Sequence, residues 1–455
     1  MATGVSRSKW NKSDLTRQDV SDSPIQLDYA GKTPAETILG TPPGQYISLL
    51  KGNDHINRLY YGDNLYVLPA LAEDTVIAGN VELIYIDPPF ATGGVFQSRR
   101  QDDAYTDLLQ GAEYIEFMRQ RLILLRKLLS ETGSIYVHLD ANMLFPMKLI
   151  MDEIFSERNF RNCITRKKCN PKNYTRKTYG NVSDHILFYT KSANYTWNRS
   201  YKAWSRQDSE QEYPYVEETT GRRYKKVPIH APGTRNGETG KPWRGMLPPP
   251  GKHWQYTPDT LEAMDRRGEI YWSPTGNPRR KIFLDKSPGK PVQDLWLDVK
   301  DAHNQNIRVT GYPTEKNPLI LERIIEASSN PGDIVLDCFC GSGTTMTVSE
   351  RLERHWIGVD NSLQAISTTL RRFAIGTDVM GDFVKKNKNG KSRQMSLFPD
   401  ALESEEMPGI RPDHQPIRDF TLYCEAGLER KLRESSAQWM KIIKASFQPQ
   451  EDNHA

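Results

Sequence analysis

Cysteine is scarce in this chain of 455 residues, which contains five of them. They are Cys163, Cys169, Cys338, Cys340 and Cys424, an odd number spread along a long sequence. That distribution excludes a disulfide scaffold and fits a reducing compartment. The cysteine spacings, with no histidine pair nearby at ligand spacing, do not match a zinc site either. We therefore expect no metal.

Long apolar runs are also missing. No stretch approaches the roughly 18 consecutive apolar residues that a membrane-spanning helix needs, and the mean hydropathy is -0.67. The amino-terminal sequence MATGVSRSKWNKSD lacks the apolar segment of a secretory signal. We therefore expect a cytoplasmic protein with no membrane partner.

Net charge is small, at +4, but it is unevenly distributed. Residues 156–310 contain 29 Lys and Arg against 16 Asp and Glu, whereas the remainder contains 32 against 41. The basic segment also contains six of the nine tryptophans. Cations among aromatic side chains suit a polyanion with stackable bases, so nucleic acid is the expected partner. The alternative is a solvated basic surface over an ordinary aromatic core.

The hydrophobic pattern predicts an α/β protein. Continuous apolar runs at 81–87, 134–140 and 355–360 are typical of buried parallel strands, and 112–130 has the periodicity of an amphipathic helix. Strands that alternate with helices predict a doubly wound, mostly parallel sheet. Between 191 and 305 the pattern lapses and Pro, Gly, Tyr and Trp dominate, which indicates an inserted β-rich or irregular domain.

These changes of pattern divide the chain into five expected segments, and the insert splits the sheet domain in sequence. The segments are an N-terminal arm of irregular structure (1–51), the first part of the sheet domain (52–190), the insert (191–305), the second part of the sheet domain (306–376), and a charged linker with a C-terminal helix (377–455). We expect that last helix at about 420–445.

A glycine-rich turn follows the predicted strand 333–337 and opens a helix. Gly341 and Gly343 allow the backbone to turn tightly and to approach a ligand at a helix N-terminus. Asp360 ends the next strand, where an acid can accept both hydroxyls of a ribose. No GKS or GKT follows and the third glycine of the dinucleotide pattern is missing, so a nucleoside-bearing ligand without a pyrophosphate is expected. The alternative is a turn that only packs helix on strand.

A second motif, Asp87-Pro88-Pro89-Phe90, directly follows a buried strand. In a parallel sheet it lies at the carboxyl edge, where such folds bind ligands. The prolines stiffen the loop and remove amide donors, which leaves the carboxylate and the carbonyls as acceptors. Acceptors beside the ring of Phe90 suit a planar base that carries an amino group. The alternative is an ordinary proline turn after a strand.

Together these motifs resemble those of the amino-group DNA methyltransferases that use S-adenosylmethionine. DPPF precedes GYPTEKNPLILERIIEASSNPGDIVLDCFCGSGTT and WIGVD, which is similar to the permuted β-class order of type III modification subunits and many type II modification enzymes. The resemblance covers about residues 58–190 and 306–362. It implies a Rossmann-like methyltransferase fold, a target-recognition role for the insert, and site-specific methylation of adenine N6 in duplex DNA. A restriction-modification or phage-defence context is expected, in the cytoplasm of a bacterial or archaeal cell and in association with the nucleoid.

The resemblance also implies roles for individual residues. Asp87 and the carbonyl of Pro88 would accept hydrogen bonds from the target amino group, and Phe90 would stack on a base flipped out of the duplex. The cofactor would be held by Asp63, Thr314, Lys316, Asp337, Phe339, Cys340, Gly341, Ser342, Gly343, Thr344, Thr345 and Asp360. The family often has TxKP, whereas here Asn317 separates Lys316 from the following proline.

A basic loop is expected to contact DNA phosphates, with a solvated surface loop as the alternative. Its residues are Arg166, Lys167, Lys168, Lys172, Arg176 and Lys177. His138 and His185 lie in apolar strands and are expected to be satisfied core histidines.

Two other functions stay open from the sequence: an idle DNA-recognition subunit, and methylation of RNA or protein. Carbon-5 methylation is excluded because the nucleophilic Pro-Cys pair does not occur. Cytosine N4 stays open as the alternative target atom, since in the family that Asp87-Pro88-Pro89-Phe90 resembles, DPPF usually accompanies adenine N6 and Ser-Pro-Pro more often cytosine N4. Family members are often homodimers, which makes a homodimer an expectation. The chain has no helicase or nuclease motif, so any linked cleavage is expected from a restriction or defence partner subunit.

Overall fold

The computed structural model describes residues 26–53, 56–89, 95–97, 103–106, 111–170, 177–301, 308–310, 312, 315–379, 384–386, 392–394, 417 and 419–447. The chain forms two compact units. Unit 1 comprises Met1–Asn198 together with Gln293–Ala455, and unit 2 comprises Arg199–Val292.

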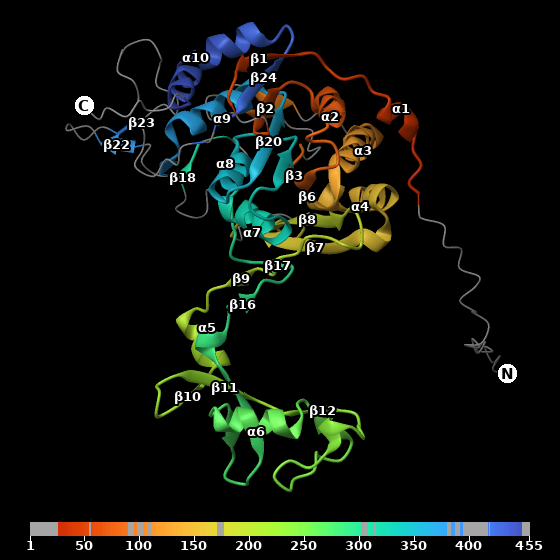
Figure 1. Ribbon diagram of the computed structural model, residues 1–455. Coiled ribbons are helices and arrows are strands. Elements are labelled where there is room, and N and C mark those ends of the chain that lie inside the picture. Colours follow the sequence, from red (N-terminus) through yellow and green to blue (C-terminus); the bar gives the residue numbers. More distant parts are fainter. Residues whose placement is uncertain are drawn as a thin grey trace, which may run out of the picture. The chain divides into compact units, whose positions relative to one another are not determined.

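A ten-stranded sheet organises unit 1 (Figure 1). Its order is β1 (Tyr46–Leu50), β24 (Thr421–Glu425), β2 (Arg58–Tyr61), β20 (His355–Asp360), β19 (Ile334–Asp337), β3 (Val81–Ile86), β6 (Leu129–Leu139), β8 (Ser183–Thr190), β7 (Phe160–Lys167) and β17 (Leu295–Trp296). Neighbours from β24 to β6 are parallel, whereas β8 is antiparallel to both β6 and β7. The predicted mostly parallel, Rossmann-like sheet is therefore confirmed.

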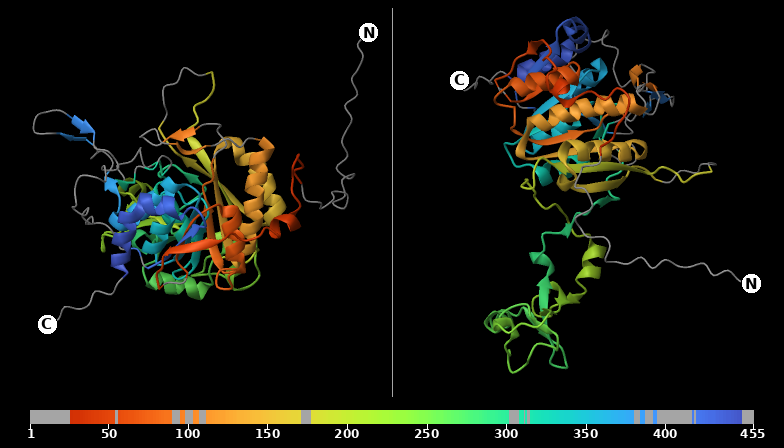
Figure 2. Two further views of the ribbon diagram at one scale, coloured as in Figure 1. Left: turned by 90° about the horizontal axis from the view of Figure 1, so that it is seen from above. Right: turned by 90° about the vertical axis from the view of Figure 1, so that its right-hand side faces the viewer.

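Helices cover both faces of this sheet, with α3 and α4 on one face and α8 and α9 on the other (Figures 1 and 2). The helices of unit 1 are α1 (Ala35–Leu39), α2 (Asn64–Glu73), α3 (Gly111–Leu128), α4 (Ala141–Phe155), α7 (Pro318–Ser328), α8 (Thr344–Arg351), α9 (Leu363–Ile375) and α10 (Glu429–Ser446). Three further strand pairs in unit 1 are β4 (Val95–Gln97) with β5 (Asp103–Thr106), β18 (Arg308–Val309) with β21 (Asp378–Val379), and β22 (Val384–Lys386) with β23 (Ser392–Gln394).

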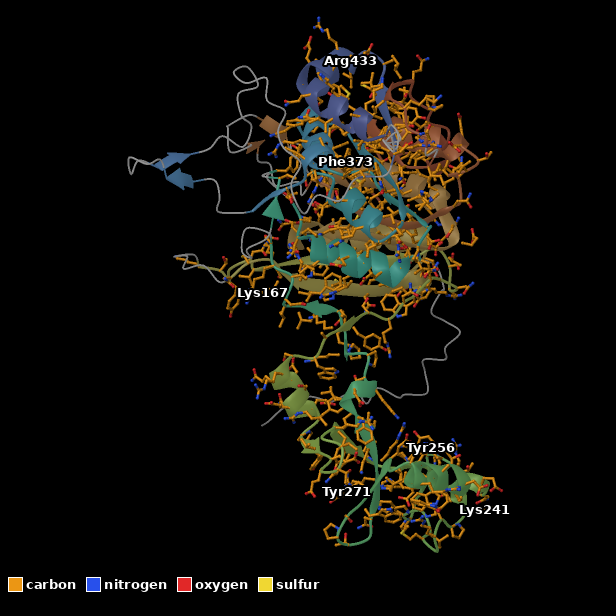
Figure 3. The ribbon with its side chains drawn as sticks, turned by 60° about the vertical axis from the view of Figure 1, so that its left-hand side comes forward. Lys167, Lys241, Tyr256, Tyr271, Phe373 and Arg433 are labelled. Carbon is orange, nitrogen blue, oxygen red and sulfur yellow. The ribbon has the colours of Figure 1, made fainter. Side chains whose placement is uncertain are left out.

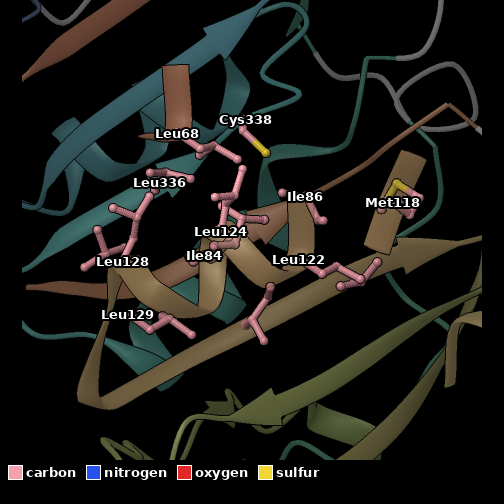
Figure 4. Packing of buried hydrophobic residues seen from close by; sticks show 14 of the residues in the cluster. Leu68, Ile84, Ile86, Met118, Leu122, Leu124, Leu128, Leu129, Leu336 and Cys338 are labelled. Atoms are coloured by element: carbon pink, nitrogen blue, oxygen red, sulfur yellow. The ribbon is translucent and has the colours of Figure 1, made fainter. Parts of the chain in front are cut away.

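The main apolar core lies where α2, α3 and α4 pack on the sheet (Figure 4). All six residues of β3 are buried, because a parallel strand covered on both faces has no solvent side. Met118, Leu122 and Leu125 of α3 follow helical spacing and are fully buried against it. This packing fixes the strand that carries the DPPF motif.

Two expectations about the chain ends are wrong. The expected N-terminal arm contains β1, which is the edge strand of the sheet. Residues 421–425, expected to begin the last helix, form β24, and α10 starts only at Glu429. Because β24 lies between β1 and β2, residues from both ends of the chain complete the same sheet.

Unit 2 falls within the insert expected at 191–305. It contains the sheet β10 (Tyr215–Val216), β11 (Arg223–Val227), β15 (Pro278–Phe283), β14 (Ile270–Trp272), the pairs β12 (His230–Pro232) with β13 (Lys252–Trp254) and β9 (Tyr201–Lys202) with β16 (Lys290–Pro291), and the helices α5 (Arg206–Glu212) and α6 (Pro258–Arg266). Its small core is built around Trp243, Trp254 and Leu261. The pair β9–β16 joins the first and last residues of the unit.

No helix in the described part of the chain has the length and apolar character needed to cross a bilayer.

Candidate active site

The two motifs singled out in the sequence end neighbouring strands. Asp87 follows β3 and Asp337 ends β19, and these strands pair in parallel with Ile84 opposite Leu336. The carboxyl ends of parallel neighbours share one edge of the sheet, so the two corners meet although the sequence separates them widely. A single pocket is lined by both corners.

Most of the predicted site residues line this pocket. They are Asp87, Pro88, Pro89, Lys316, Asp337, Phe339, Cys340, Gly341, Ser342, Thr344, Thr345 and Asp360. Gly343 lies just behind the pocket as the N-cap of α8, and Asp63 reaches the pocket wall through Arg121. Phe90 and Thr314 lie outside the described residues.

Two carboxylates shape the glycine-rich turn. Asp337 accepts hydrogen bonds from Phe339 N at 3.0 Å and Thr345 Oγ1 at 2.5 Å. Asp360 accepts hydrogen bonds from Gly341 N at 2.9 Å and Ser362 N at 2.8 Å. The backbone at Gly341 has φ +51°, a left-handed conformation that favours glycine. The turn therefore follows the carboxylates closely and leaves its outer side open to the pocket.

Burial changes the proton affinity of both acids. It raises the pKa of Asp337 to about 7, and the negative charges of Asp87 and Asp360 add to the effect. It raises the pKa of Asp360 to about 6. Burial also raises the pKa values of the Cys338 and Cys340 thiols well above their usual range. These cysteines are packing residues of the turn, with little thiolate available for chemistry.

The Asp87 carboxylate has two unlike oxygens. Its Oδ2 lies 2.8 Å from Lys316 Nζ. Its Oδ1 is buried and has no hydrogen-bond partner in the part of the chain that the structure describes. A buried acceptor without a partner is costly in a folded protein, so a ligand that donates a hydrogen bond to Oδ1 would offset that cost.

The segment that carries Lys316 is fastened to the back of the glycine-rich turn. Glu315 pairs with Arg372 at 3.0 Å, and both side chains are buried. Arg372 donates to the Ser342 carbonyl at 2.9 Å and to Thr344 Oγ1 at 2.8 Å. This buried ion pair ties the Lys316 segment to the turn and helps to place the Lys316 ammonium at Asp87.

The pocket wall contains residues that the sequence analysis missed, namely Asn64, Tyr85, Phe117, Arg121 and Tyr312. Arg121 Nη2 lies 2.9 Å from Asp63 Oδ1, and its guanidinium lies 3.6 Å from the centre of the Phe117 ring. Burial lowers the pKa of Arg121, and the charge of Asp63 opposes that change. The one available signal was a charged residue on the apolar face of a predicted helix.

The predicted DNA-contacting loop is only partly compatible with the structure. Arg166 is 1% exposed, and its guanidinium bonds to Asp184 and Asp301, so its assignment to DNA phosphates is wrong. Lys177 is exposed, and Lys167, labelled in Figure 3, is half-buried at the end of β7, as is Lys168 just beyond it. Lys172 and Arg176 lie outside the described residues.

Comparison with known proteins identifies the family. A family model described as DNA methylase matches residues 81–371. The type II methyltransferase M.EcaI of Enterobacter cloacae is 47% identical over 375 residues, which cover 80% of this chain and 81% of that protein. The chain belongs to the DNA methylase family. It is an S-adenosylmethionine-dependent DNA methyltransferase of the restriction-modification type. The predicted family and the predicted cofactor are therefore confirmed.

More distant DNA methylases span less of the chain. The StyLTI Mod subunit of a type III restriction-modification enzyme of Salmonella typhimurium is 27% identical and is matched over 72% of this chain and 56% of that protein. The solved M1.HpyAVI–SAM complex is 17% identical, with a TM-score of 0.38, over 69% of this chain and 98% of that chain.

Proposed function

We propose that this DNA methyltransferase transfers the methyl group of S-adenosylmethionine to N6 of an adenine flipped out of duplex DNA at a specific sequence. The observation that carries the proposal is the buried Oδ1 of Asp87, which has no hydrogen-bond partner among the described residues, beside the pocket that also contains the glycine-rich turn. The resemblance of the DPPF motif to adenine-specific enzymes supports adenine over cytosine N4.

The pocket residues suit S-adenosylmethionine. The Asp360 carboxylate would accept the ribose hydroxyls, and the glycine-rich turn leaves room for the methionine part. The rings of Phe117 and Phe339, whose centres lie 6.1 Å apart, offer apolar faces for the adenine moiety. The bound cofactor supplies an electrophilic methyl group on a sulfonium.

Asp87 Oδ1 and the Pro88 carbonyl would act on the target amine. The exocyclic nitrogen of adenine is a weak nucleophile, because its lone pair is delocalised into the ring. Acceptors that lie off the ring plane localise that pair and stabilise the positive charge that develops during attack. Asp87 Oδ1 would accept the proton that the amine loses as it takes the methyl group, while the bond pair of the broken carbon–sulfur bond would stay on sulfur. Alignment at roughly 3 Å supplies much of the remaining acceleration.

We also propose that unit 2 reads the target sequence. Its residues carry 18 Lys and Arg against 11 Asp and Glu. On one face of its sheet, Lys226 Nζ lies 3.6 Å from the centre of the Tyr215 ring and 3.5 Å from that of Tyr271, which Figure 3 labels. Cations held among aromatic rings suit contact with phosphates and bases.

Product analysis tests the proposal. Duplex DNA is incubated with tritiated S-adenosylmethionine and digested to nucleosides, and duplex RNA serves as the competing substrate. We expect label in N6-methyldeoxyadenosine. Label in N4-methyldeoxycytidine, or in RNA alone, would contradict the proposed target. The Asp87→Ala variant should bind the cofactor in isothermal titration but transfer no label, and near-normal turnover of that variant would remove Asp87 from the mechanism.

A further inference from the structure

A row of buried polar side chains crosses four neighbouring strands beside the active site. Tyr85 OH lies 2.8 Å from His138 Nδ1, and His138 Nε2 lies 3.0 Å from Asp184 Oδ2. Arg166 bonds to both oxygens of Asp184, at 2.8 and 2.5 Å. These residues come from β3, β6, β8 and β7, and each is at most 3% exposed. We call them the polar row.

The near end of the polar row belongs to the active-site pocket. Tyr85 lines the pocket two residues before Asp87. Burial raises the pKa of Tyr85 well above its usual range, and the charges of Asp87 and Asp337 add to the effect. The phenol therefore keeps its proton and can donate it to His138 Nδ1, which leaves an Nε2–H to face Asp184.

The far end of the polar row is bonded to Gln293–Asp301, the return segment on which the chain re-enters unit 1. Arg166 Nη2 lies 2.7 Å from Asp301 Oδ1, and Arg166 Nη1 donates to the Val299 carbonyl at 3.2 Å. The return segment also pairs with β7 through Leu295 and Trp296. It is thus anchored along the strand that carries Arg166.

A second route connects the return segment to the same catalytic corner. Asn317 Nδ2 donates to the Lys300 carbonyl at 2.8 Å, and Asn317 Oδ1 caps α7 by accepting from Leu319 N. Asn317 directly follows Lys316, whose ammonium pairs with Asp87. The return segment therefore reaches Asp87 from two sides, through the polar row and through Lys316.

Stability alone does not explain such a row. Burying Arg166, Asp184 and His138 together has a desolvation penalty, and well-packed apolar residues of similar volume often serve stability as well or better. A connected row of polar contacts does fix geometry, because each contact restricts the next.

We propose that Tyr85, His138, Asp184 and Arg166 are positioning residues that hold the Asp87 corner in a fixed relation to the return segment. The inference deepens the proposed function, because it rests on the role given there to Asp87. The return segment directly follows the proposed recognition unit in sequence, so within unit 1 the network links the segment next to that unit in the chain to the corner that carries Asp87.

The first test compares two variants that each remove one buried phenol oxygen. Tyr85→Phe breaks the near end of the row. The control Tyr136→Phe removes a hydroxyl that lies 2.7 Å from Ser328 Oγ on the same sheet, at 2% exposure and outside the pocket lining. We expect Tyr85→Phe to lower the single-turnover rate of methyl transfer about 10-fold or more through misalignment. Cofactor affinity and the KM for DNA should stay near those of the wild type, and Tyr136→Phe should keep the wild-type rate.

The second test uses a double-mutant cycle between the two ends. Asp301→Asn weakens the far end at a side chain that is 35% exposed, so folding should survive. Combined with Tyr85→Phe, it should lower the rate little beyond the larger single effect, since both changes break one network. A wild-type rate for Tyr85→Phe, an equal loss for Tyr136→Phe, or simple additivity in the cycle would each overturn the inference. If Asp87→Ala itself keeps turnover, the proposed function fails instead.

Discussion

Lys316 Nζ lies 2.8 Å from Asp87 Oδ2. The family resemblance places Lys316 at the methionine end of the cofactor, whereas the structure brings its ammonium to the carboxylate proposed to act on the target amine. One oxygen of Asp87 is thus held by a cation, and the other is buried without a described partner. On the proposed mechanism, the ion pair leaves a single oxygen of Asp87 to accept from the target amine.

Replacement of Lys316 tests this division between the two oxygens. We expect Lys316→Met to lower kcat by roughly 100-fold, because the loss of one preorganised charged group at a reacting centre has an effect of that order. Lys316→Arg should recover part of the rate. Isothermal titration should give cofactor affinities close to that of the wild type. Loss of cofactor affinity with an unchanged kcat in the Lys316→Met variant would show that Lys316 serves cofactor binding and not the orientation of Asp87.

The acid pair Asp337 and Asp360 predicts how stability depends on pH. Their folded pKa values of about 7 and about 6 exceed the value near 4 of an unfolded chain, so the folded protein binds protons more tightly. These groups therefore destabilise the cofactor-free protein above about pH 7, and stability should rise as the pH falls toward about 5.

Asp337→Asn should remove most of that pH dependence. At about pH 8 it should raise the free energy of unfolding by on the order of 1–3 kcal/mol, because an amide has no buried charge to desolvate. Urea denaturation at a series of pH values measures both effects. Wild-type stability that falls between about pH 8 and pH 5 would contradict the prediction.

Gly343 should tolerate no side chain, for reasons of both backbone and packing. Its φ is +77°, and a Cβ there would lie 2.8 Å from Thr369 Cγ2. Gly343→Ala should therefore lower the free energy of unfolding by more than the roughly 1–2 kcal/mol of a left-handed residue alone. Gly79, with φ +74° and open space around a Cβ, supplies the control Gly79→Ala. Equal losses for the two variants in thermal unfolding would rule out the packing contribution.

Replacement of Arg166 and of Lys177 should distinguish a cation that stabilises the fold from one that contacts DNA. Arg166→Ala leaves the buried Asp184 carboxylate without its main cationic partner and should lower stability by about 3–5 kcal/mol. Lys177→Ala should leave stability unchanged and reduce the salt slope of DNA binding by about 1. Thermal unfolding and salt-dependent binding titrations measure the two effects. A salt slope unaffected by Lys177→Ala would place that lysine away from the phosphates.

The local motifs made the core of this molecule predictable from sequence. The apolar run of β3 and the glycine-rich turn after β19 each have a strong local signature, and parallel pairing brings their ends together. The pattern also indicated that Asp87 and Asp360 would lie at one sheet edge, as the shared pocket lining shows.

The missed features depend on contacts between distant segments. β24 is short and follows a highly charged stretch, so only its pairing with β1 and β2 reveals it as a strand. Arg166 looked like part of a basic loop because its partners Asp184 and Asp301 lie elsewhere in the sequence. Arg121 was overlooked because Asp63, which pairs with it, precedes another helix and lies far away in the sequence.

The short pair β9–β16 has a consequence for how such proteins diversify. Tyr201 and Lys202 lie beside Pro291 and Lys290, so the residues at which the chain enters and leaves unit 2 are paired with each other. Two recombination events in the gene, one before the codon for Arg199 and one after that for Val292, would exchange unit 2 for another domain and leave every strand of the ten-stranded sheet in place. On the proposal that unit 2 reads the target sequence, such an exchange would change the target preference, while the methyl-transferring residues of unit 1 would be inherited unchanged.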